Sequence, residues 1–476
     1  LPRFTDFCPA MGLLNKIIRL FVDTVLLLTV IAFFPGIPPH ADFPVIMSDT
    51  PLTREGPLAY NNILDGGVRL FENKFSAPES VAHRGRENEI FVSMHGGSIV
   101  KVYGPEYSDV KEVAKIGPGC KGPWDERVCG RPLGLRFAND GKLLVADSYL
   151  GIFKVDVDTG DKERLMDPSI AINGAVPLII DDLDEDADGN IYWSDASTIS
   201  DLAMGTTEVL AGPTGRLVKL DPITGHNLVL LDKLAFANGV QLSPDQDFVL
   251  VCETTKSRVI RYWLKGPKAG TNDVFVSGLP GLPDNIRAKP QGGYYVSLVS
   301  VKPVDSPDLL TVLNQLPWLR RLCIRILYAT KKMFDAITYV YENQLTAQVS
   351  YLILNTKSIV AVTNGNRAFV VELGADGNVT GSLQGHSGTI CFISQTDVVG
   401  DRLFFSSPYN NYLGMIPLWK VNGEPEPEGV KKRQPTIKIR PRNDPESAFH
   451  IEVAPEDLAS SGKQQEKVVK KKKEEL

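Results

Sequence analysis

Short apolar runs that alternate with polar positions recur along most of this chain, and a turn rich in Gly, Asp or Pro follows each of them. These strand–turn–strand units begin near residues 89, 141, 189, 215, 247, 292, 367 and 402. Equivalent strands return after about 50 residues, the period of a four-stranded propeller blade. The pattern predicts an all-β, six-bladed β-propeller over residues 55–421, with a strand near residue 67 closing the ring. The alternative is a pair of β-sandwiches, but regular hairpins without helical interludes favour the propeller.

One segment, at about 303–341, leaves this period and takes on helical spacing. Its apolar residues, Trp318 among them, are interleaved with five basic ones. A basic amphipathic helix with Trp at its edge is typical of a membrane interface, and a cap packed over the propeller mouth is the other interpretation. We expect a helical insertion that caps the propeller and also touches a membrane.

The N-terminal region 1–40 contains an apolar run from Ile17 to Phe34, with Lys16 and Arg19 near its start. A run of about 18 residues is close to the minimum for a membrane span, and basic residues before it favour a cytosolic N-terminus. The pattern predicts a signal-anchor of a single-pass membrane protein with a lumenal or extracellular propeller, in the endoplasmic reticulum or the plasma membrane. Because Asp23 interrupts the run, a cleaved signal peptide is the alternative.

The C-terminal region 422–476 is rich in Lys, Glu and Gln and almost free of aromatic residues. Such a composition buries too little apolar surface to fold, so it predicts a disordered, charged tail. The last four residues, KEEL, resemble a retrieval signal of the endoplasmic reticulum, although a Lys- and Glu-rich tail also produces this pattern by chance. The sequon at Asn378 predicts N-glycosylation if the propeller is lumenal.

The net charge and the cysteines of the chain indicate what kind of partner and which compartment to expect. The net charge of −6 gives no basic footprint, so we expect no nucleic-acid partner. Six cysteines are too few for a disulfide scaffold, but Cys120 and Cys129 flank a short, turn-rich stretch. Such a loop closes readily as a disulfide in an oxidising compartment; the alternative is two unrelated thiols.

Polar oxygen donors occupy comparable points in several predicted blades. They are Glu79 in APES, Asp181 after the apolar run VPLII, Asn238 in FANGV, and Asp284 and Asn285 in LPDNI. A propeller gathers such positions around one axis, and carboxylate and amide oxygens are the ligands that Ca²⁺ or Mg²⁺ prefers. The competing interpretation is that Asn-Gly and Pro-Asp-Asn only form turns.

Several motifs between about residues 55 and 420 together resemble the strictosidine synthase-like family. They are APES, CGRPLGLRF, LLVADSYLGIFKVD, FANGVQLSPDQDFVLVCETTKSRVIRYWLKG, GLPDNIR and GGYYVSL. The resemblance implies a six-bladed propeller, a Cys120–Cys129 disulfide and kinship with calcium-dependent paraoxonases and lactonases. It also implies one axial Ca²⁺, held at the positions that match the ligands of those enzymes: Glu79, Asp181, Asn238 and Asp284, with Asn285 as a further ligand.

This chain departs from the pattern of those relatives at four positions. Asp181 replaces the usual asparagine, and its extra charge should tighten cation binding and reduce Lewis acidity. Ser394 stands where strictosidine synthase has its condensing glutamate, which argues against that reaction. Leu133 and Ser148 stand at or near the positions of the paraoxonase histidine pair.

Two functional hypotheses follow from this sequence. The first is a metal-dependent hydrolase of aryl esters or lactones, in which Asp284 or Glu79 acts as the general base. The second is a non-catalytic membrane scaffold or binding propeller with a structural cation.

Overall fold

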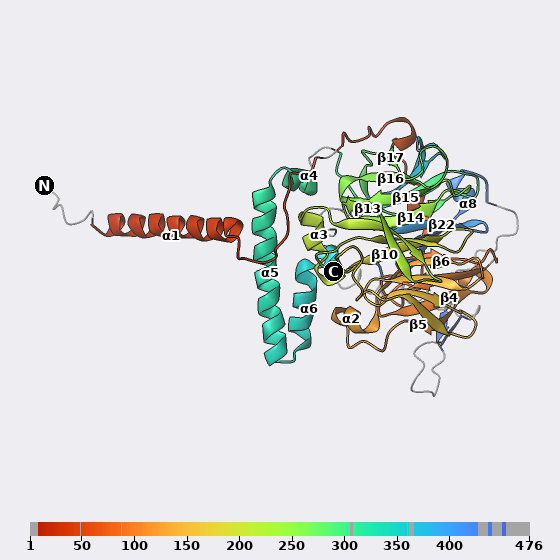
Figure 1. Ribbon diagram of the computed structural model, residues 1–476, viewed down its shortest axis with the longest axis horizontal. Helices are drawn as coiled ribbons and strands as arrows, with labels where there is room; N and C mark the ends of the chain where they lie inside the picture. The colour runs from red at the N-terminus through yellow and green to blue at the C-terminus, as the bar shows by residue number, and fades with distance from the viewer. Residues whose placement is uncertain are drawn as a thin grey trace, which may run out of the picture.

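The computed structural model describes residues 8–47, 49–86, 88–304, 308–358, 360, 366–426, 437–439 and 450–453. Its body consists of six antiparallel sheets, each built on four strands (Figure 1). The first strand of each sheet contacts the first strands of both neighbouring sheets, so these six inner strands close a ring. The predicted six-bladed β-propeller is therefore confirmed.

The first three blades follow the chain directly. They contain β2 (Val81–Ala82), β3 (Glu89–Ser93), β4 (Ser98–Tyr103) and β5 (Asp109–Lys115); β6 (Pro132–Phe137), β7 (Leu143–Asp147), β8 (Gly151–Val155) and β9 (Lys162–Met166); and β10 (Ile180–Glu185), β11 (Ile191–Asp195), β12 (Gly215–Asp221) and β13 (His226–Leu234). In each of these blades the strands are hydrogen-bonded in sequence order from the innermost to the outermost, so each inner strand begins a new blade.

The other three blades include the strand that closes the ring. They contain β14 (Ala237–Leu242), β15 (Phe248–Glu253), β16 (Arg258–Trp263) and β17 (Asn272–Val276); β18 (Gly281–Ala288), β19 (Tyr294–Val301), β20 (Ala368–Leu373) and β21 (Val379–Gly385); and β22 (Gln395–Val399), β23 (Arg402–Ser406), β24 (Leu413–Pro417) and β1 (Val68–Leu70). The N-terminal strand β1 pairs with β24, with Val68 opposite Met415. This pairing confirms the predicted closing strand and links the two ends of the propeller.

The apolar core lies between neighbouring blades. Trp193 of β11 is fully buried and packs with Leu144 of β7 and Val218 of β12 in one apolar cluster. Comparable clusters fill the other spaces between blades. Because each sheet buries both of its faces, its strands consist of nearly continuous buried runs, for example over β7 and β11.

The helical insertion separates β19 from β20 and is longer than predicted. It consists of α4 (Leu309–Asn314), α5 (Pro317–Val340) and α6 (Gln344–Leu354), so it extends past the expected end near residue 341. Together with α3 (Thr206–Leu210), these helices form a layer beside one end of the propeller (Figure 1). The short helices α2 (Glu126–Cys129) and α8 (Leu418–Val421) lie in loops of the propeller.

Helix α1 (Cys8–Phe33) projects away from the propeller and carries the segment for which a membrane-spanning anchor was predicted (Figure 1). No helix in the described part of the chain has both the length and the apolarity that crossing a membrane requires. The predicted anchor is therefore not supported. Arg19 and Asp23, whose side chains lie 3.8 Å apart, interrupt the apolar run.

The predicted tail lies mostly outside the described residues, and so does the KEEL sequence. Two of its segments are described as strands, β25 (Ile437–Ile439) and β26 (His450–Val453), and β26 pairs with β5. They extend the blade that contains β2 to β5 to six strands.

Candidate metal centre and cavity

The predicted cation ligands converge around the propeller axis, in or just before the inner strands of four blades. Glu79 precedes β2, Asp181 lies in β10, Asn238 in β14, and Asp284 and Asn285 in β18. One carboxylate oxygen from each of Glu79, Asp181 and Asp284 lies within 4.8 Å of the other two. Oxygens bound to one Ca²⁺ at about 2.4 Å are at most about 5 Å apart, so one cation fits within reach of all three.

The buried oxygens of this centre lack the partners that buried polar atoms normally have. Four of them have no hydrogen-bond partner among the described residues: Oε2 of Glu79, Oδ1 of Asp181, Oδ1 of Asn238 and Oδ1 of Asn285. All four side chains are at least 95% buried. A buried oxygen without a partner is costly, and a hard divalent cation satisfies several such oxygens at once. The residues present therefore fit a Ca²⁺-type ion.

The three carboxyl groups of this centre have raised pKa values, chiefly because they are buried. Burial, followed by the charges of Asp284 and Asp181, raises the pKa of Glu79 well above its usual value. Burial and the charge of Asp284 do the same for the pKa of Asp181. Burial raises the pKa of Asp284 to about 8, although its hydrogen bond with Asn238 opposes the shift. Crowded carboxyl groups with raised pKa values are typical of sites that bind a cation or a proton.

β-Bulges direct these side chains toward the axis. The pairing of β10 with β11 shifts register between Ile180 and Leu183, and that of β18 with β19 shifts between Pro283 and Ile286. An extra residue at a bulge bends the strand and redirects a side chain. In β10 the bulge contains both acids, so that Asp181 lines the cavity while Asp182 contacts Arg287 deeper on the axis.

Asn238-Gly239 is not the turn that its sequence suggests, because it lies inside the inner strand β14. A Cβ atom on Gly239 would lie 2.5 Å from the Cα of Asn285. Glycine is therefore required for the two inner strands to approach this closely, and that approach brings Asn238 next to Asp284.

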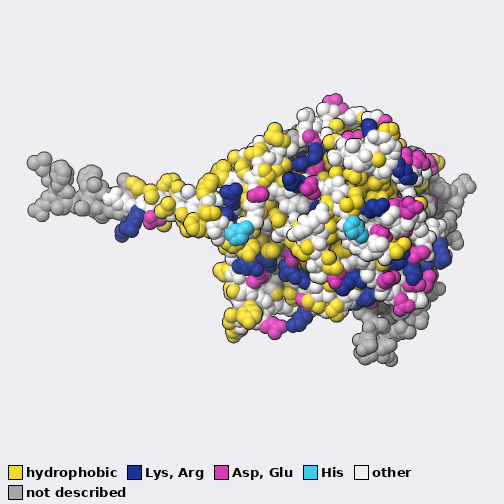
Figure 2. All heavy atoms as spheres, viewed as in Figure 1, with side chains coloured by type: hydrophobic (Ala, Val, Ile, Leu, Met, Phe, Trp, Pro, Cys, Tyr) yellow, Lys and Arg dark blue, Asp and Glu magenta, His cyan; other side chains and the backbone are white. Residues whose placement is uncertain are grey.

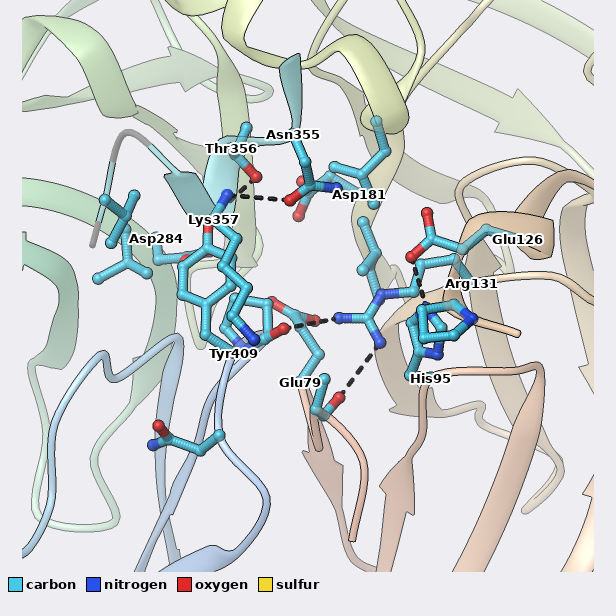
Figure 3. Close-up of a pocket in the computed structure, with 18 of the residues that line it drawn as sticks. Glu79, His95, Glu126, Arg131, Asp181, Asp284, Asn355, Thr356, Lys357 and Tyr409 are labelled. Carbon is cyan, nitrogen blue, oxygen red and sulfur yellow. Dashed lines mark hydrogen bonds and ion pairs between the residues drawn. The ribbon is translucent and has the colours of Figure 1, made fainter. Parts of the chain in front are cut away.

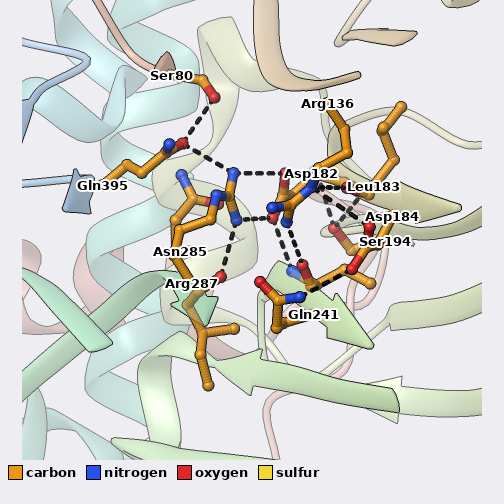
Figure 4. Close-up of polar contacts among 12 residues, drawn as sticks. Ser80, Arg136, Asp182, Leu183, Asp184, Ser194, Gln241, Asn285, Arg287 and Gln395 are labelled. Carbon is orange, nitrogen blue, oxygen red and sulfur yellow. Dashed lines mark hydrogen bonds and ion pairs between the residues drawn. The ribbon is translucent and has the colours of Figure 1, made fainter. Parts of the chain in front are cut away.

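An ion pair fills the axis beneath the metal centre (Figure 4). Arg287 donates two hydrogen bonds to Asp182, at 2.6 and 3.0 Å, and a third to Gln395 at 2.8 Å. The oxygen of Gln395 also accepts from Ser80, next to Glu79 in the sequence. Asp182 and Arg287 are at most 2% exposed, so this network joins three inner strands in the absence of solvent.

We expect Arg287→Met to destabilise the propeller by about 3–5 kcal/mol, because it leaves the buried Asp182 carboxylate without its cation. Urea unfolding measures the loss. Arg402→Met is the matched control: its partner Glu106 is half exposed, and we expect a loss below about 1 kcal/mol. Similar losses for the two variants would contradict a special role for the axial pair.

The metal centre lies in a cavity of about 400 Å³ (Figure 3). Its wall includes Arg131, which donates to the backbone carbonyls of Ala77 and Pro408. Tyr409 lines another part of the wall and donates to Thr356, which lies just beyond α6. The insertion thus contributes directly to the lining, and Phe236, Leu282 and Val299 are among the apolar side chains of the wall.

The cavity also contains a histidine that the sequence analysis did not single out. Nε2 of His95 lies 2.7 Å from Oε1 of Glu126, and both residues line the cavity (Figure 3). Nδ1 of His95 has no hydrogen-bond partner among the described residues. His95 was missed because its partner comes from a different loop, and the MHGGS motif gives no sign of this contact.

The predicted disulfide between Cys120 and Cys129 is present, with Cα atoms 5.3 Å apart. It closes the loop that carries Glu126. A Cβ atom on Gly97 would lie 1.9 Å from the carbonyl oxygen of Cys129, so the loop packs directly against the turn after His95. The disulfide and this glycine together explain how Glu126 reaches His95.

Two tyrosines fix the Glu126 carboxylate further. Tyr149 donates to it at 3.1 Å, and Tyr351 of α6 donates at 2.7 Å. Burial alone would raise the pKa of Glu126, but the hydrogen bond from His95 and the charge of Arg131 outweigh it and lower the pKa. Glu126 is therefore a fixed anion that orients His95 and links the insertion to the propeller.

The remaining positions named from the sequence lie outside the set of proposed ligands. Oγ of Ser394 donates to the backbone carbonyl of Glu79 at 2.6 Å, so it supports a ligand-bearing segment. Leu133 lines the cavity, and the buried Ser148 hydroxyl has no partner among the described residues. Asn378 is exposed just before β21, and its glycosylation stays a prediction.

Comparison with known proteins identifies related sequences. A family profile described as strictosidine synthase matches residues 181–267. The chain is 34% identical over 440 residues to the adipocyte plasma membrane-associated protein Hemomucin of Drosophila melanogaster, covering 90% of this chain and 72% of that protein. It is 39% identical to the adipocyte plasma membrane-associated protein of Gallus gallus, covering 60% and 68%, and 38% identical to that of Homo sapiens, covering 60% and 67%.

Similar solved structures have much lower sequence identity. A gluconolactonase of Xanthomonas campestris aligns with a TM-score of 0.46 at 15% identity, covering 80% of this chain and 98% of that one. A calcium-binding protein, regucalcin, of Agrobacterium tumefaciens aligns with a TM-score of 0.44 at 11% identity, covering 73% and 92%.

Proposed function

This chain belongs to the strictosidine synthase-like family, among the adipocyte plasma membrane-associated proteins, and on that premise we propose that it is a metal-dependent ester hydrolase of the arylesterase or lactonase type. One observation carries the proposal. Three buried carboxylates, two of them with an unsatisfied oxygen, share a single cavity with a histidine paired to a buried carboxylate. Ser394 offers no carboxylate where the condensing glutamate would stand, so we do not propose strictosidine synthesis.

The proposed ligand residues contribute two kinds of donor to a bound Ca²⁺ ion. Glu79, Asp181 and Asp284 supply negative charge, and the amide oxygens of Asn238 and Asn285 complete the set of hard donors. When bound, such a cation polarises a substrate carbonyl and lowers the pKa of water.

We assign the general base to His95 and not to Asp284 or Glu79. Both carboxylates belong to the ligand set, and a carboxylate bound to a cation is a weak base. If Nε2–H of His95 donates to Glu126, the free Nδ1 carries the lone pair that a base needs.

The hydrolytic step then balances with one water. Nδ1 takes a proton from water as the water oxygen bonds to the ester carbonyl carbon. Glu126 stabilises the resulting imidazolium by its charge. When the carbon–oxygen bond to the alcohol breaks, the imidazolium returns the proton to the leaving oxygen, which gives an acid, an alcohol and neutral His95.

The test is hydrolysis of phenyl acetate by the purified full chain, with calcium and with EDTA. We expect calcium-dependent turnover that Glu79→Gln lowers on the order of 100-fold, because the variant removes one charged ligand. Glu163→Gln, on an exposed strand, is the matched control and should keep full activity. Wild-type turnover no faster than that of Glu79→Gln would exclude the hydrolase.

The second candidate function is a non-catalytic binding propeller with a structural cation, and Asp181 is the observation that favours it. A third carboxylate binds a cation more tightly but leaves it a weaker Lewis acid. On this alternative, Asp284→Asn lowers the melting temperature and no ester turnover exists to be lost. If the variant keeps the melting temperature but loses turnover, the binding-propeller alternative fails.

We also propose that the propeller lies at a membrane, in a lumenal or extracellular compartment. The names of the relatives describe association with the plasma membrane. The Cys120–Cys129 disulfide supports an oxidising compartment, because such bonds persist there and are rare in the cytosol. Alkylation of thiols before and after reduction, on protein taken directly from cells, tests this: only a bridged pair is protected before reduction.

A further inference from the structure

Helix α5 combines buried cationic side chains with an exposed apolar face, which is unusual for a helix on a protein surface. Toward the protein it buries two cationic side chains, Arg320 and Lys331, beside the apolar Ile324. A third, Arg325, is buried against the end of α1. Toward the outside it presents apolar side chains that are between 41% and 79% exposed, namely Trp318, Ile326, Met333, Ile337 and Val340. A soluble surface helix normally places these two classes the other way round.

The exposed apolar residues, with the partly buried Leu322, form one continuous stripe. Trp318, Leu322, Ile326, Ala329, Met333, Ala336, Ile337 and Val340 follow one another at intervals of three or four residues, apart from the adjacent pair at 336 and 337. This spacing places them on one face of α5, over a length of about 33 Å. Among the described elements, α6 and the propeller pack against other faces of α5, and α1 meets α5 through its end at Arg325, so most of the stripe stays exposed. An uncovered apolar face of this size marks a binding surface.

Hydrogen bonds fix the buried cationic side chains of α5 to neighbouring elements. They therefore also fix the rotation of α5 and the direction in which its apolar stripe points. Arg320 donates to the carbonyls of Leu210 and Ala211 at the end of α3. Lys331 donates to the hydroxyl of Ser350 on α6 at 2.8 Å. A rotation of α5 that buried the stripe would expose apolar neighbours and break these bonds, so the outward apolar face is built into the fold.

The position of helix α1 indicates what kind of partner binds the apolar stripe of α5. Arg325 donates to the carbonyls of Ile31, Ala32 and Phe34, so it fixes the end of α1 against α5. Beyond that joint, α1 extends away from the body, crosswise to α5, with apolar side chains exposed along it (Figures 1 and 2). A groove on a protein partner would cover the exposed face of only one of these two helices. A broad apolar phase accommodates both a projecting helix and a flat one.

We propose that the outer face of α5 lies on a lipid bilayer, with the helix axis in the membrane plane and the stripe in the interfacial region. The ends of the stripe have the residues that favour this region: Trp318 at one end, and Tyr339 and Tyr341 at the other. At its edge, Arg321 and the exposed Lys332 are placed to meet anionic headgroups. This surface is distinct from the cavity and does not depend on ester hydrolysis.

The experiment measures contact of α5 with lipid and uses the full chain, so that α1 is common to every variant. Vesicles of phosphatidylcholine and phosphatidylserine carry a doxyl quencher high in the acyl chain. We expect quenching of tryptophan fluorescence in vesicle-bound wild type, and we expect Trp318→Phe to remove most of it. Equal quenching in both proteins would overturn the proposal.

A charge-insertion variant tests the rest of the stripe. We expect Ile326→Asp/Met333→Asp to lower vesicle partitioning on the order of tenfold, because each change moves a charge into the apolar interface. Ile223→Asp, a 92% exposed position in a propeller turn, is the matched control and should not change it. Unchanged partitioning of the double variant would overturn the proposal. So would self-association without vesicles that this variant abolishes, because the occupant would then be a second copy of the chain.

Discussion

Removal of the cation with EDTA should lower the melting temperature of the propeller, and the loss should grow as pH rises from 6 to 8. Without a cation, burial and neighbouring carboxylates raise the pKa values of Glu79 and Asp181, and burial and the charge of Asp182 raise that of Asp284 to about 8. Between the unfolded pKa of a carboxyl group, near 4, and this raised value, the folded chain holds more protons than the unfolded chain. The free energy of unfolding of the metal-free protein therefore falls as pH rises through this window.

Calcium should reverse this trend, because it replaces the protons on the same carboxylates. Its affinity should rise with pH up to about 8, where Asp284 is largely deprotonated. At a calcium concentration of 100 Kd, binding contributes about 2.7 kcal/mol, which corresponds to roughly 3 °C for a chain of this size. Scanning calorimetry at pH 6, 7 and 8, with EDTA and with calcium, measures both effects.

Glu79→Gln is the control for this assignment, because it removes one of the three carboxyl groups. We expect a weaker pH dependence in EDTA and little or no shift with calcium. A wild-type melting temperature in EDTA that rises between pH 6 and 8 would contradict the assignment of these three groups as the dominant buried acids. A wild type that does not respond to calcium would contradict the cation site itself.

His95→Gln should lower kcat for phenyl acetate on the order of 100- to 1000-fold, the usual contribution of a general base. Glutamine retains a donor toward Glu126 but cannot take a proton at the position of Nδ1. Because His95 is not among the proposed ligands, the calcium-induced shift in melting temperature should remain, and KM should change little. His386→Gln, a change of a histidine stacked on Tyr60 outside the cavity, is the matched control and should keep kcat.

A second readout does not depend on turnover. Diethyl pyrocarbonate acylates an accessible imidazole nitrogen, and mass spectrometry of peptides locates the product. We expect acylation of His95 in the wild type, and slower acylation in Glu126→Gln because the anion that polarises the ring is lost. A His95→Gln variant with kcat within threefold of wild type would exclude His95 as the base while leaving the metal-dependent activity intact. Unreactive His95 would show that Nδ1 is not available.

The repeated hairpins made the architecture predictable, because a strand pattern with a fixed period needs only local information. The same holds for the closing strand near Val68, whose pairing with β24 the repeat count requires. The candidate ligands were also accessible to sequence reasoning. Asp181 and Asp284 are acids placed in or beside apolar runs, and a propeller brings equivalent positions of its blades to one axis.

Other features depend on contacts that no local pattern encodes. The disulfide loop places Glu126 beside His95, which is 31 residues away in the sequence. Tyr351, which is 225 residues from Glu126, donates a hydrogen bond to the same carboxylate. The Asn238-Gly239 pair read equally well as a turn, and only packing against β18 shows that glycine is needed inside a strand. The α5 pattern indicated an amphipathic helix but not which face would be buried.

The sequence by itself determined the six blades, the closing strand and the oxygen-rich positions around the axis, because hydrophobic periodicity and repeat length are local properties. Only the tertiary structure decided that a fixed anion accompanies His95, that Asp182 is paired with Arg287 beneath the ligands, and that α5 turns its apolar face outward. Each of these depends on which distant side chain occupies the adjoining space, and that is settled only when the blades and the insertion pack together.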